Sequence, residues 1–488
     1  MDASARGVAS GPRTSVNAPR WTEFPLISCL ALGWLFWLFA WVPLATFPYQ
    51  IDYGEGLMME GAMCIRQGRA LYPAVNGFSG VIHVYGPLAY AAAAATLPAD
   101  GVSFTVGRFL MLLCTVAISA MIAVMLWRRT HSMRLGVAFG LLLPLVPAFR
   151  FWSYLLRADL IGIAISIAGL MLYATKPKYA HWTIPFFVTA LFCKYSLLAA
   201  PFAVFLHMIA KRRAVDAVRF AVILGLSCES LFLLLQRKTA GAFAFHMFST
   251  HPDGYSLTQF FHLAALAWLG APVVTGLAGY YIVSRLGSGE ADLASLYFVS
   301  ASINSLTAGK PGAATNHFLE WMIAACMCAG LGYAALRSRY PRRMVQISLI
   351  LGFSVLLAVV MQNRPASQPF SELSECAGAY QYVAQSRSSR VLSQSLGPLL
   401  LTGKPVLLTD PFVYGQLVEH GRWSDSALVQ QVKEQYFGLI IVNVDPEHLQ
   451  TGEFSIWPKS LLDALGHNYH AAKHFNCRDS SQMLEPKP

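Results

Sequence analysis

Long apolar runs separated by short polar connections occupy the first three quarters of the chain. Most of them have about the length that an α-helix needs to cross a bilayer, and the shorter ones suit kinked, tilted or re-entrant helices. The pattern predicts an α-helical polytopic membrane protein with about eleven spans, whose approximate limits are 24–46, 104–127, 133–149, 160–174, 181–193, 195–210, 215–235, 260–284, 293–308, 316–336 and 345–362.

Composition supports this interpretation. Hydrophobic residues make up 55% of the 488 residues and charged residues only 12%, about half of the roughly 25% that is usual in soluble domains. These values exclude a disordered protein and an ordinary cytosolic enzyme. Nine cysteines are too few for a disulfide scaffold in a chain of this length.

The net charge of +11 indicates a topology rather than a nucleic-acid partner. If residues 1–22 form a disordered cytoplasmic tail, the connections predicted on the cytoplasmic side hold 17 Lys and Arg, and those on the other side hold 8. This bias follows the positive-inside rule and predicts a cytoplasmic N-terminus. With an odd number of spans, the region after the predicted transmembrane domain (23–362) lies outside the cytoplasm.

The C-terminal region, 363–488, has the composition of a soluble domain, with 10 basic and 12 acidic residues. Apolar runs at 406–410 and 437–445 predict buried strands, and the segments 412–420 and 424–436 predict helices between them. The order predicts a small extracytoplasmic α/β domain. Cys376 and Cys477 lie near its two ends, where they are equally consistent with a disulfide and with two free buried thiols.

The first outer loop, 47–103, is too apolar to be a simple connector. Its segments 55–68 and 84–97 both predict helices that lie at the membrane surface. Three acids, Asp52, Glu55 and Glu60, stand near its start. Asp52 and Glu55 share a face if this turn is helical. Carboxylates at a membrane edge are candidates for general bases, and the alternative is that they cap the first helix and face water.

Three short motifs in this loop carry a resemblance to a known group. They are D-x-G-E-G at 52–56, G-R-x-L-Y-P at 68–73 and Y-G-P-L-x-Y at 85–90. In order and spacing they resemble the GT-C superfamily of membrane glycosyltransferases, in particular the branch that contains the aminoarabinose transferases and protein O-mannosyltransferases. The resemblance covers the chain through about residue 210, and beyond that only the topology agrees.

The resemblance implies catalytic roles for the acids of the first motif. Relatives often open this loop with an adjacent Asp-Glu pair about a dozen residues before the Gly of the second motif. Glu55 matches that Glu, whereas Gly54 precedes it here and the nearest Asp is Asp52. We favour Asp52 as the general base, with Glu55 orienting the base or the substrate, and the departure leaves either assignment open. Tyr85 in the third motif is a candidate substrate-binding residue.

Further candidate substrate-binding residues stand at the outer ends of later spans. Basic groups there suit a leaving phosphate, and polar, glycine-rich backbone between apolar runs is tolerated mainly where it lines a cavity. Each has a structural alternative. Arg157 and Asp159 could form a local surface pair, and Lys194 could extend to the membrane interface. The segment 304–320 could be a simple outer loop with a helix cap. The candidates are Arg157, Asp159, Lys194, Lys310, Asn316, His317 and Glu320.

The resemblance implies an integral membrane glycosyltransferase that moves a sugar from a polyprenyl-phosphate donor to an acceptor hydroxyl, with inversion. The acceptor belongs to a lipid-linked glycan, an envelope polymer or a protein, and the location implied is the bacterial inner membrane. No cofactor and no metal-ligand set is predicted, although a divalent metal ion stays an open alternative. The rival hypothesis is a transporter or flippase, which the intramembrane Glu229 would suit because such groups usually face the bundle interior.

Overall fold

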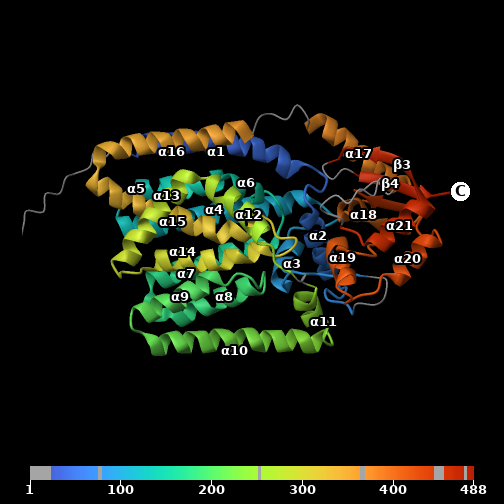
Figure 1. Ribbon diagram of the computed structural model, residues 1–488, viewed down its shortest axis with the longest axis horizontal. Helices are drawn as coiled ribbons and strands as arrows, with labels where there is room; N and C mark the ends of the chain where they lie inside the picture. Colours follow the sequence, from blue (N-terminus) through green and yellow to red (C-terminus); the bar gives the residue numbers. More distant parts are fainter. Residues whose placement is uncertain (1–22, 75–79, 251–253, 363–368, 444–455, 478–480) are drawn as a thin grey trace, which may run out of the picture.

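The computed structural model describes residues 23–74, 80–250, 254–362, 369–443, 456–477 and 481–488. The predicted tail 1–22 lies outside this part of the chain. Figure 1 shows two parts, a helical body and a smaller unit with the sheet at one end of it. The helices of the body run mostly along the long axis of the molecule, with α1 and α16 side by side along one edge and α10 along the opposite edge.

The α-helices of the first part are α1 (Phe24–Thr46), α2 (Tyr53–Arg66), α3 (Pro87–Ala94), α4 (Phe104–Thr130), α5 (Met133–Leu142), α6 (Pro147–Trp152), α7 (Ala158–Thr175), α8 (Ile184–Leu191), α9 (Ala199–Ala210), α10 (Ala214–Lys238), α11 (Ala242–Ala244), α12 (Leu257–Leu269), α13 (Pro272–Gly287), α14 (Leu293–Ser305), α15 (Leu319–Arg339) and α16 (Pro341–Gln362). Short 3₁₀ segments connect several of them.

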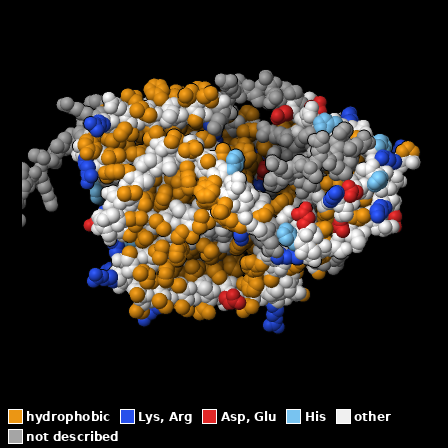
Figure 2. All heavy atoms as spheres, viewed as in Figure 1, with side chains coloured by type: hydrophobic (Ala, Val, Ile, Leu, Met, Phe, Trp, Pro, Cys, Tyr) orange, Lys and Arg blue, Asp and Glu red, His pale blue; other side chains and the backbone are white. Residues whose placement is uncertain are grey.

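Helices are found in all eleven apolar runs, and the chain is a multi-pass membrane protein. Within the described residues, six helices are long and apolar enough to cross a membrane. The predicted span 260–284 is instead a broken pair, α12 and α13, bent by 96°. Because the other runs give shorter helices, the count of eleven crossings stays a prediction. Figure 2 shows hydrophobic side chains covering the helical body on this face, with charged side chains gathered at its ends and over the sheet unit.

The first outer loop contains both predicted helices, α2 and α3. Asp52 begins α2, since its side chain accepts a hydrogen bond from the Gly54 amide at 2.9 Å, as an N-cap residue does. However, α2 is not exposed on the surface of the protein, and its position at the membrane surface stays a prediction. Most of its residues from Gly54 to Cys64 are buried, because α3 and the C-terminal unit pack against it.

The C-terminal unit contains a four-stranded sheet in the order β1-β2-β4-β3. Strands β1 and β2 are parallel, and the other two pairings are antiparallel. The helices predicted at 412–420 and 424–436 are present as α19 and α20. The elements of this unit are α17 (Pro369–Gln385), β1 (Val391–Ser393), α18 (Leu396–Thr402), α19 (Pro411–Glu419), α20 (Ser426–Lys433), β2 (Leu439–Val442), α21 (Lys459–Asn468), β3 (Tyr469–Phe475) and β4 (Ser481–Pro486).

One predicted strand is wrong. Residues 406–410 are irregular, although Leu408 and Thr409 are buried. The Thr409 hydroxyl accepts a hydrogen bond from the Ile82 amide at 2.7 Å, and its own amide donates to the Gly80 carbonyl at 3.3 Å. The apolar run is therefore buried against the first outer loop instead of joining the sheet.

The C-terminal unit is also attached to the start of the first outer loop. The Gln50 side chain accepts a hydrogen bond from the Gly397 amide and donates one to the Ser395 hydroxyl at 3.1 Å. Within the unit, Cys376 and Cys477 form a disulfide. Of the two alternatives that the sequence left open, the structure therefore has the disulfide and not two free thiols. The unit is thus held close to the candidate acids that follow Gln50.

Candidate active site

Glu55 is completely buried in an ion pair with Arg108 of α4. Both side chains are 0% exposed, and the guanidinium donates to the two carboxylate oxygens at 2.8 and 2.7 Å. The same carboxylate also accepts hydrogen bonds from the Ile51 amide at 2.9 Å and the Leu156 amide at 3.2 Å. Because four donors already occupy it, Glu55 is suited to fixing the backbone around the site rather than to accepting a proton.

Arg108 lies in the apolar run 104–127, and sequence reasoning assigned it no role. Besides Glu55, its guanidinium donates to three backbone carbonyls in the last turn of α1 and just after it, those of Leu44, Phe47 and Tyr49. One arginine thus joins α4, the end of α1 and the start of α2. The signal that could have found it is the arginine itself, because a charge in a predicted span needs a partner.

Asp52 is the more accessible of the two acids. Its side chain is 22% exposed, and Oδ2 lies 2.7 Å from Nη1 of Arg157, the residue that precedes α7. Gly54 makes this pair fit, since a Cβ at that position would lie 2.1 Å from Nη1 of Arg157. The first glycine of the D-x-G-E-G motif, Gly54, is therefore explained by the ion pair beside it.

Arg157 also holds Tyr85 in the site. Its Nη2 donates to the Tyr85 hydroxyl at 3.0 Å, and its guanidinium lies 5.0 Å from the Trp152 ring centroid. Burial raises the pKa of Tyr85 to about 12, although the nearby guanidinium opposes this shift. The phenol is therefore a hydrogen-bond donor or acceptor, not an ion, at neutral pH.

Asp159 connects Arg157 to residues from two later parts of the chain. Its carboxylate forms ion pairs with Lys194 and with Nε of Arg157, the latter at 3.6 Å. The Asn316 side-chain amide donates to the same carboxylate at 3.0 Å. The structure thus brings together six of the predicted residues. Arg157 contacts Asp52, Tyr85 and Asp159, and the Asp159 carboxylate in turn contacts both Lys194 and Asn316.

His317 and Glu320 line a small cavity of about 10 Å³ beside Asp159, together with Lys194 and Asn316. The Glu320 carboxylate accepts a hydrogen bond from Asn304 at 3.2 Å. His317 shares a hydrogen bond with the Thr307 hydroxyl at 2.8 Å. Lys310, predicted with this group, lies in the connection between η4 (Leu306–Gly309) and η5 (Thr315–Phe318), where it is exposed and does not line the cavity.

An apolar groove lies next to the polar cavity. It has a volume of about 750 Å³ and is formed by residues of α8, α9, α10 and α14. Asn304 lines both the groove and the cavity, and Thr307, the partner of His317, lines the groove. The polar side chains of the candidate site and the apolar groove are therefore in contact here.

The C-terminal unit contributes one acid that sequence reasoning missed. Asp410, the residue before α19, is 4% exposed and accepts a hydrogen bond from the Tyr53 hydroxyl at 2.8 Å. Burial raises the pKa of Asp410 above its ordinary value, against the effect of its hydrogen bonds. Tyr53 follows the candidate base Asp52, so the C-terminal unit reaches the edge of the site.

Glu229, the intramembrane acid that the transporter hypothesis used, does not face the bundle interior. It is exposed on α10, a helix of which only 6% is buried in the most apolar window. The expectation of an interior position is wrong because α10 lies at the edge of the body and packs on it mainly through α9 and α8.

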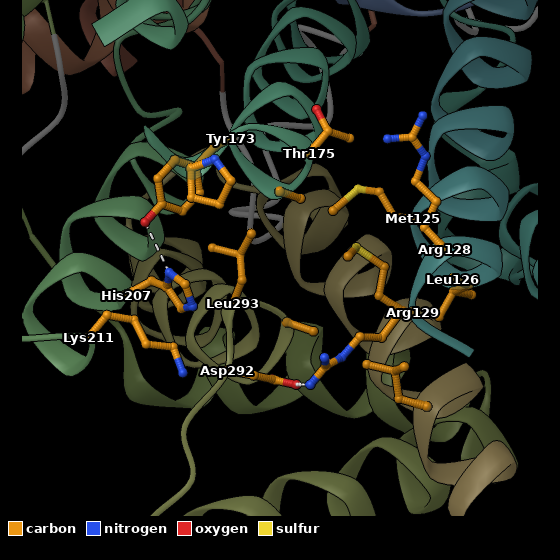
Figure 3. A pocket seen from close by; sticks show the side chains of 15 residues that line it. Met125, Leu126, Arg128, Arg129, Tyr173, Thr175, His207, Lys211, Asp292 and Leu293 are labelled. Carbon is orange, nitrogen blue, oxygen red and sulfur yellow. Dashed lines mark hydrogen bonds and ion pairs between the residues drawn. The ribbon is translucent and has the colours of Figure 1, made fainter. Parts of the chain in front are cut away.

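A second cavity lies at the other end of α4 and α7, away from this chain of residues. Figure 3 shows Arg128, Arg129, His207, Lys211 and Asp292 around it. Its volume is about 390 Å³. Its cations are among those that the charge bias assigns to the cytoplasmic side, and none of the predicted site residues lines it.

Among the residues that the structure describes, no group of three or more His, Cys, Asp and Glu side chains could hold a metal ion. The carboxylate of Asp159 instead contacts Lys194 and Arg157.

Two solved structures share the fold over almost the whole chain. They are ArnT from Cupriavidus metallidurans in the apo state and the same protein bound to undecaprenyl phosphate. The TM-score is 0.62 for both, at 12% and 11% sequence identity, and the matches cover 93% of this chain and 98% and 97% of those chains. No family model and no curated protein sequence matches the chain.

ArnT is a GT-C aminoarabinose transferase. The GT-C fold that the motifs of the first outer loop predicted is therefore confirmed. The chain is a multi-pass membrane protein with this fold. At 11–12% sequence identity the comparison establishes the shared fold alone.

Proposed function

We propose that the protein is an integral membrane glycosyltransferase that takes a sugar from a polyprenyl-phosphate donor. The observation that carries the proposal is the contact between the polar cavity and the apolar groove through Asn304. A sugar phosphate on a polyprenol needs both environments side by side. The structural neighbour bound to undecaprenyl phosphate supports a lipid of this class.

In this proposal Asp52 is the general base. Its carboxylate is partly exposed, and its hydrogen bond with the Gly54 amide and its ion pair with Arg157 both fall on Oδ2, which leaves Oδ1 for an incoming hydroxyl. Glu55 is a positioning residue, because its ion pair with Arg108 and two backbone amides consume its oxygens. The structure thus supports the assignment that the sequence favoured.

Arg157 and Lys194 would bind the donor phosphate. Each is partly exposed, at 17% and 13%, and each is paired with an acid of the site. A phosphate that enters between them competes with Asp52 and Asp159 for the two cations. Charge-assisted hydrogen bonds of this kind stabilise the negative charge that builds on the leaving group.

The proposed reaction is a single displacement. The acceptor oxygen forms a bond to the anomeric carbon while its proton passes to Asp52, and the bond between that carbon and the phosphate oxygen breaks. Polyprenyl phosphate leaves with the electron pair of the broken bond. One displacement assisted by one carboxylate inverts the configuration at the anomeric carbon.

We further propose that the C-terminal unit lies outside the cytoplasm, where it forms part of the acceptor side of the site. The Cys376–Cys477 disulfide supports an oxidising compartment, and the charge bias of the connections supports the same orientation. Asp410, hydrogen-bonded to Tyr53, is the residue of this unit placed to influence an acceptor. A lipid-linked glycan, an envelope polymer and a protein are the acceptor classes to test.

The test is purified protein with a panel of polyprenyl-phosphate sugars and an envelope extract as the source of acceptors. Mass spectrometry would follow the released polyprenyl phosphate. A glycosyltransferase releases it only when an acceptor is present. Translocation of a donor or another polar solute into vesicles without any acceptor would instead favour the transporter.

A further inference from the structure

The cavity of Figure 3 lies about one bilayer thickness away from the candidate active site. Arg108, which holds Glu55 at the site, and Arg128, which lines the cavity, stand 20 residues apart on α4. At about 1.5 Å per residue they are about 30 Å apart along the helix axis, which matches the hydrocarbon core of a bilayer. Trp127, beside Arg128, is 47% exposed, and tryptophan is enriched at membrane interfaces. This spacing places the cavity at the membrane surface opposite the site.

The polar side of this cavity carries more positive than negative charge. Its cations are Arg128 and Arg129 at the end of α4 and Lys211 just after α9, and its one acid among the described lining residues is Asp292. Figure 3 shows Arg129 and Lys211 reaching toward each other from opposite sides, with Asp292 between them. All three cations are exposed, so a ligand can reach them. Arg129 pairs with Asp292, whereas Arg128 and Lys211 form no ion pair within the described part of the chain.

The carboxylate of Asp292 is balanced by groups of the protein itself. As the N-cap of α14, it accepts a hydrogen bond from the Ser295 amide at 3.0 Å, and the Tyr281 hydroxyl donates to its other oxygen. The Arg285 guanidinium lies 3.8 Å from the same carboxylate, and that of Arg129 lies 3.5 Å from it. An anionic ligand therefore meets little repulsion from this acid, and the excess positive charge is free to attract it.

The rest of the cavity is apolar and extends into the helical body. Met125 and Leu126 stand three residues before the two arginines of α4, and Met327 and Leu331 line the cavity from α15. Met327 is 12 residues from the end of α15, which is about 18 Å along the helix axis. A free phosphate ion at the cations would leave this apolar part unfilled. A lipid would fill it with an acyl chain while its phosphate stays at the membrane surface.

We propose that this cavity binds the phosphate group of a membrane lipid, with the phosphate between Arg128, Arg129 and Lys211 and an acyl chain along the apolar wall. Guanidinium and ammonium groups both suit a phosphate, to which they donate charge-assisted hydrogen bonds. The site is separate from the proposed reaction and does not depend on it. The bound lipid would hold the end of α4 to the end of α9 at the surface opposite the candidate active site.

The test is native mass spectrometry of the full-length protein in detergent, titrated with phosphatidylglycerol and, in competition, with inorganic phosphate. Arg128→Gln and Lys211→Gln each remove one cation of the cavity. Lys178→Gln is the matched control, because Lys178 is an exposed cation that the charge bias assigns to the same side and that does not line the cavity. Size-exclusion profiles establish that each variant is folded, and Lys211→Gln supplies the answer if Arg128→Gln does not fold.

We expect about a tenfold loss of phosphatidylglycerol affinity in Arg128→Gln and in Lys211→Gln, and the wild-type affinity in Lys178→Gln. Inorganic phosphate should displace the lipid only at a much higher concentration, because it has no chain to fill the apolar part. Unchanged lipid binding in either folded cavity variant would overturn the proposal. So would an equal loss in Lys178→Gln, which would show attraction by the charge of the whole surface, or inorganic phosphate that displaces the lipid at a similar concentration.

Discussion

Glu55 and Arg108 form an ion pair in which both side chains are fully buried, with 2.7 Å between Nη2 and Oε2. Removing one partner leaves an uncompensated charge in the interior, which costs about 3–5 kcal/mol. We therefore expect Glu55→Gln to lower the free energy of unfolding by about this amount, measured by thermal unfolding in detergent. Asp52→Asn, at a partly exposed pair, should change it by less than about 1 kcal/mol. Equal stabilities of the two variants would contradict the structural role of Glu55.

Gly54 should matter for activity more than for folding. A Cβ there would lie 2.1 Å from Nη1 of Arg157, so Gly54→Ala displaces the guanidinium that we assign to the phosphate. A shift of about 1 Å can cost about a hundredfold in rate, and release of polyprenyl phosphate is the measurement. Gly276→Ala is the control, since no atom lies within 4 Å of the added Cβ. If both variants keep wild-type rates, the guanidinium has no role in the reaction.

Asp410 should make stability depend on pH. Because burial raises the pKa of its carboxyl in the folded state, the folded protein holds a proton that the unfolded chain releases near the ordinary pKa of about 3.9. Its contribution to stability is therefore present below that value and is lost as pH rises through the raised pKa. We expect Asp410→Asn to gain stability relative to wild type between about pH 4 and neutrality, measured by unfolding at several pH values. A constant difference across that range would be the contrary result.

The disulfide should stabilise the C-terminal unit. Cys376 and Cys477 are 101 residues apart, and removing a native bridge costs about 2–5 kcal/mol. We expect Cys376→Ser to unfold at a lower temperature than the wild-type protein, and added reductant to lower the unfolding temperature of the wild type in the same way. Cys228→Ser, which changes a free cysteine, should unfold at the wild-type temperature. Peptide mapping without reductant should recover the two cysteines in one linked pair. Separate peptides would show that the thiols are free.

The helical body could be predicted from the sequence because the apolar runs are local signals. The same signal failed for 406–410, where an apolar segment is buried by the first outer loop and Thr409 bonds that loop instead of a neighbouring strand. Strand β1 was missed for a related reason. Its three residues are too short to stand out and depend on pairing with β2.

The candidate site was only partly predictable. Asp52 and Arg157 stand 105 positions apart, and the sequence could nominate both but could not show that they touch. Lys310 has the right chemistry but is exposed, because a charge alone does not tell which way a turn faces. Arg108 and Asp410 were missed because their roles depend on tertiary partners, Glu55 and Tyr53.

The central claim is that Asp52 deprotonates the acceptor. The most direct measurement is the rate at which Asp52→Asn releases polyprenyl phosphate from a donor that the wild-type protein uses. A general base typically contributes about 10²–10⁴-fold to a rate, so we expect a loss in this range with an unchanged unfolding temperature. Asp216→Asn, at an exposed ion pair far along the chain, should react at the wild-type rate. Full activity in Asp52→Asn would contradict the account.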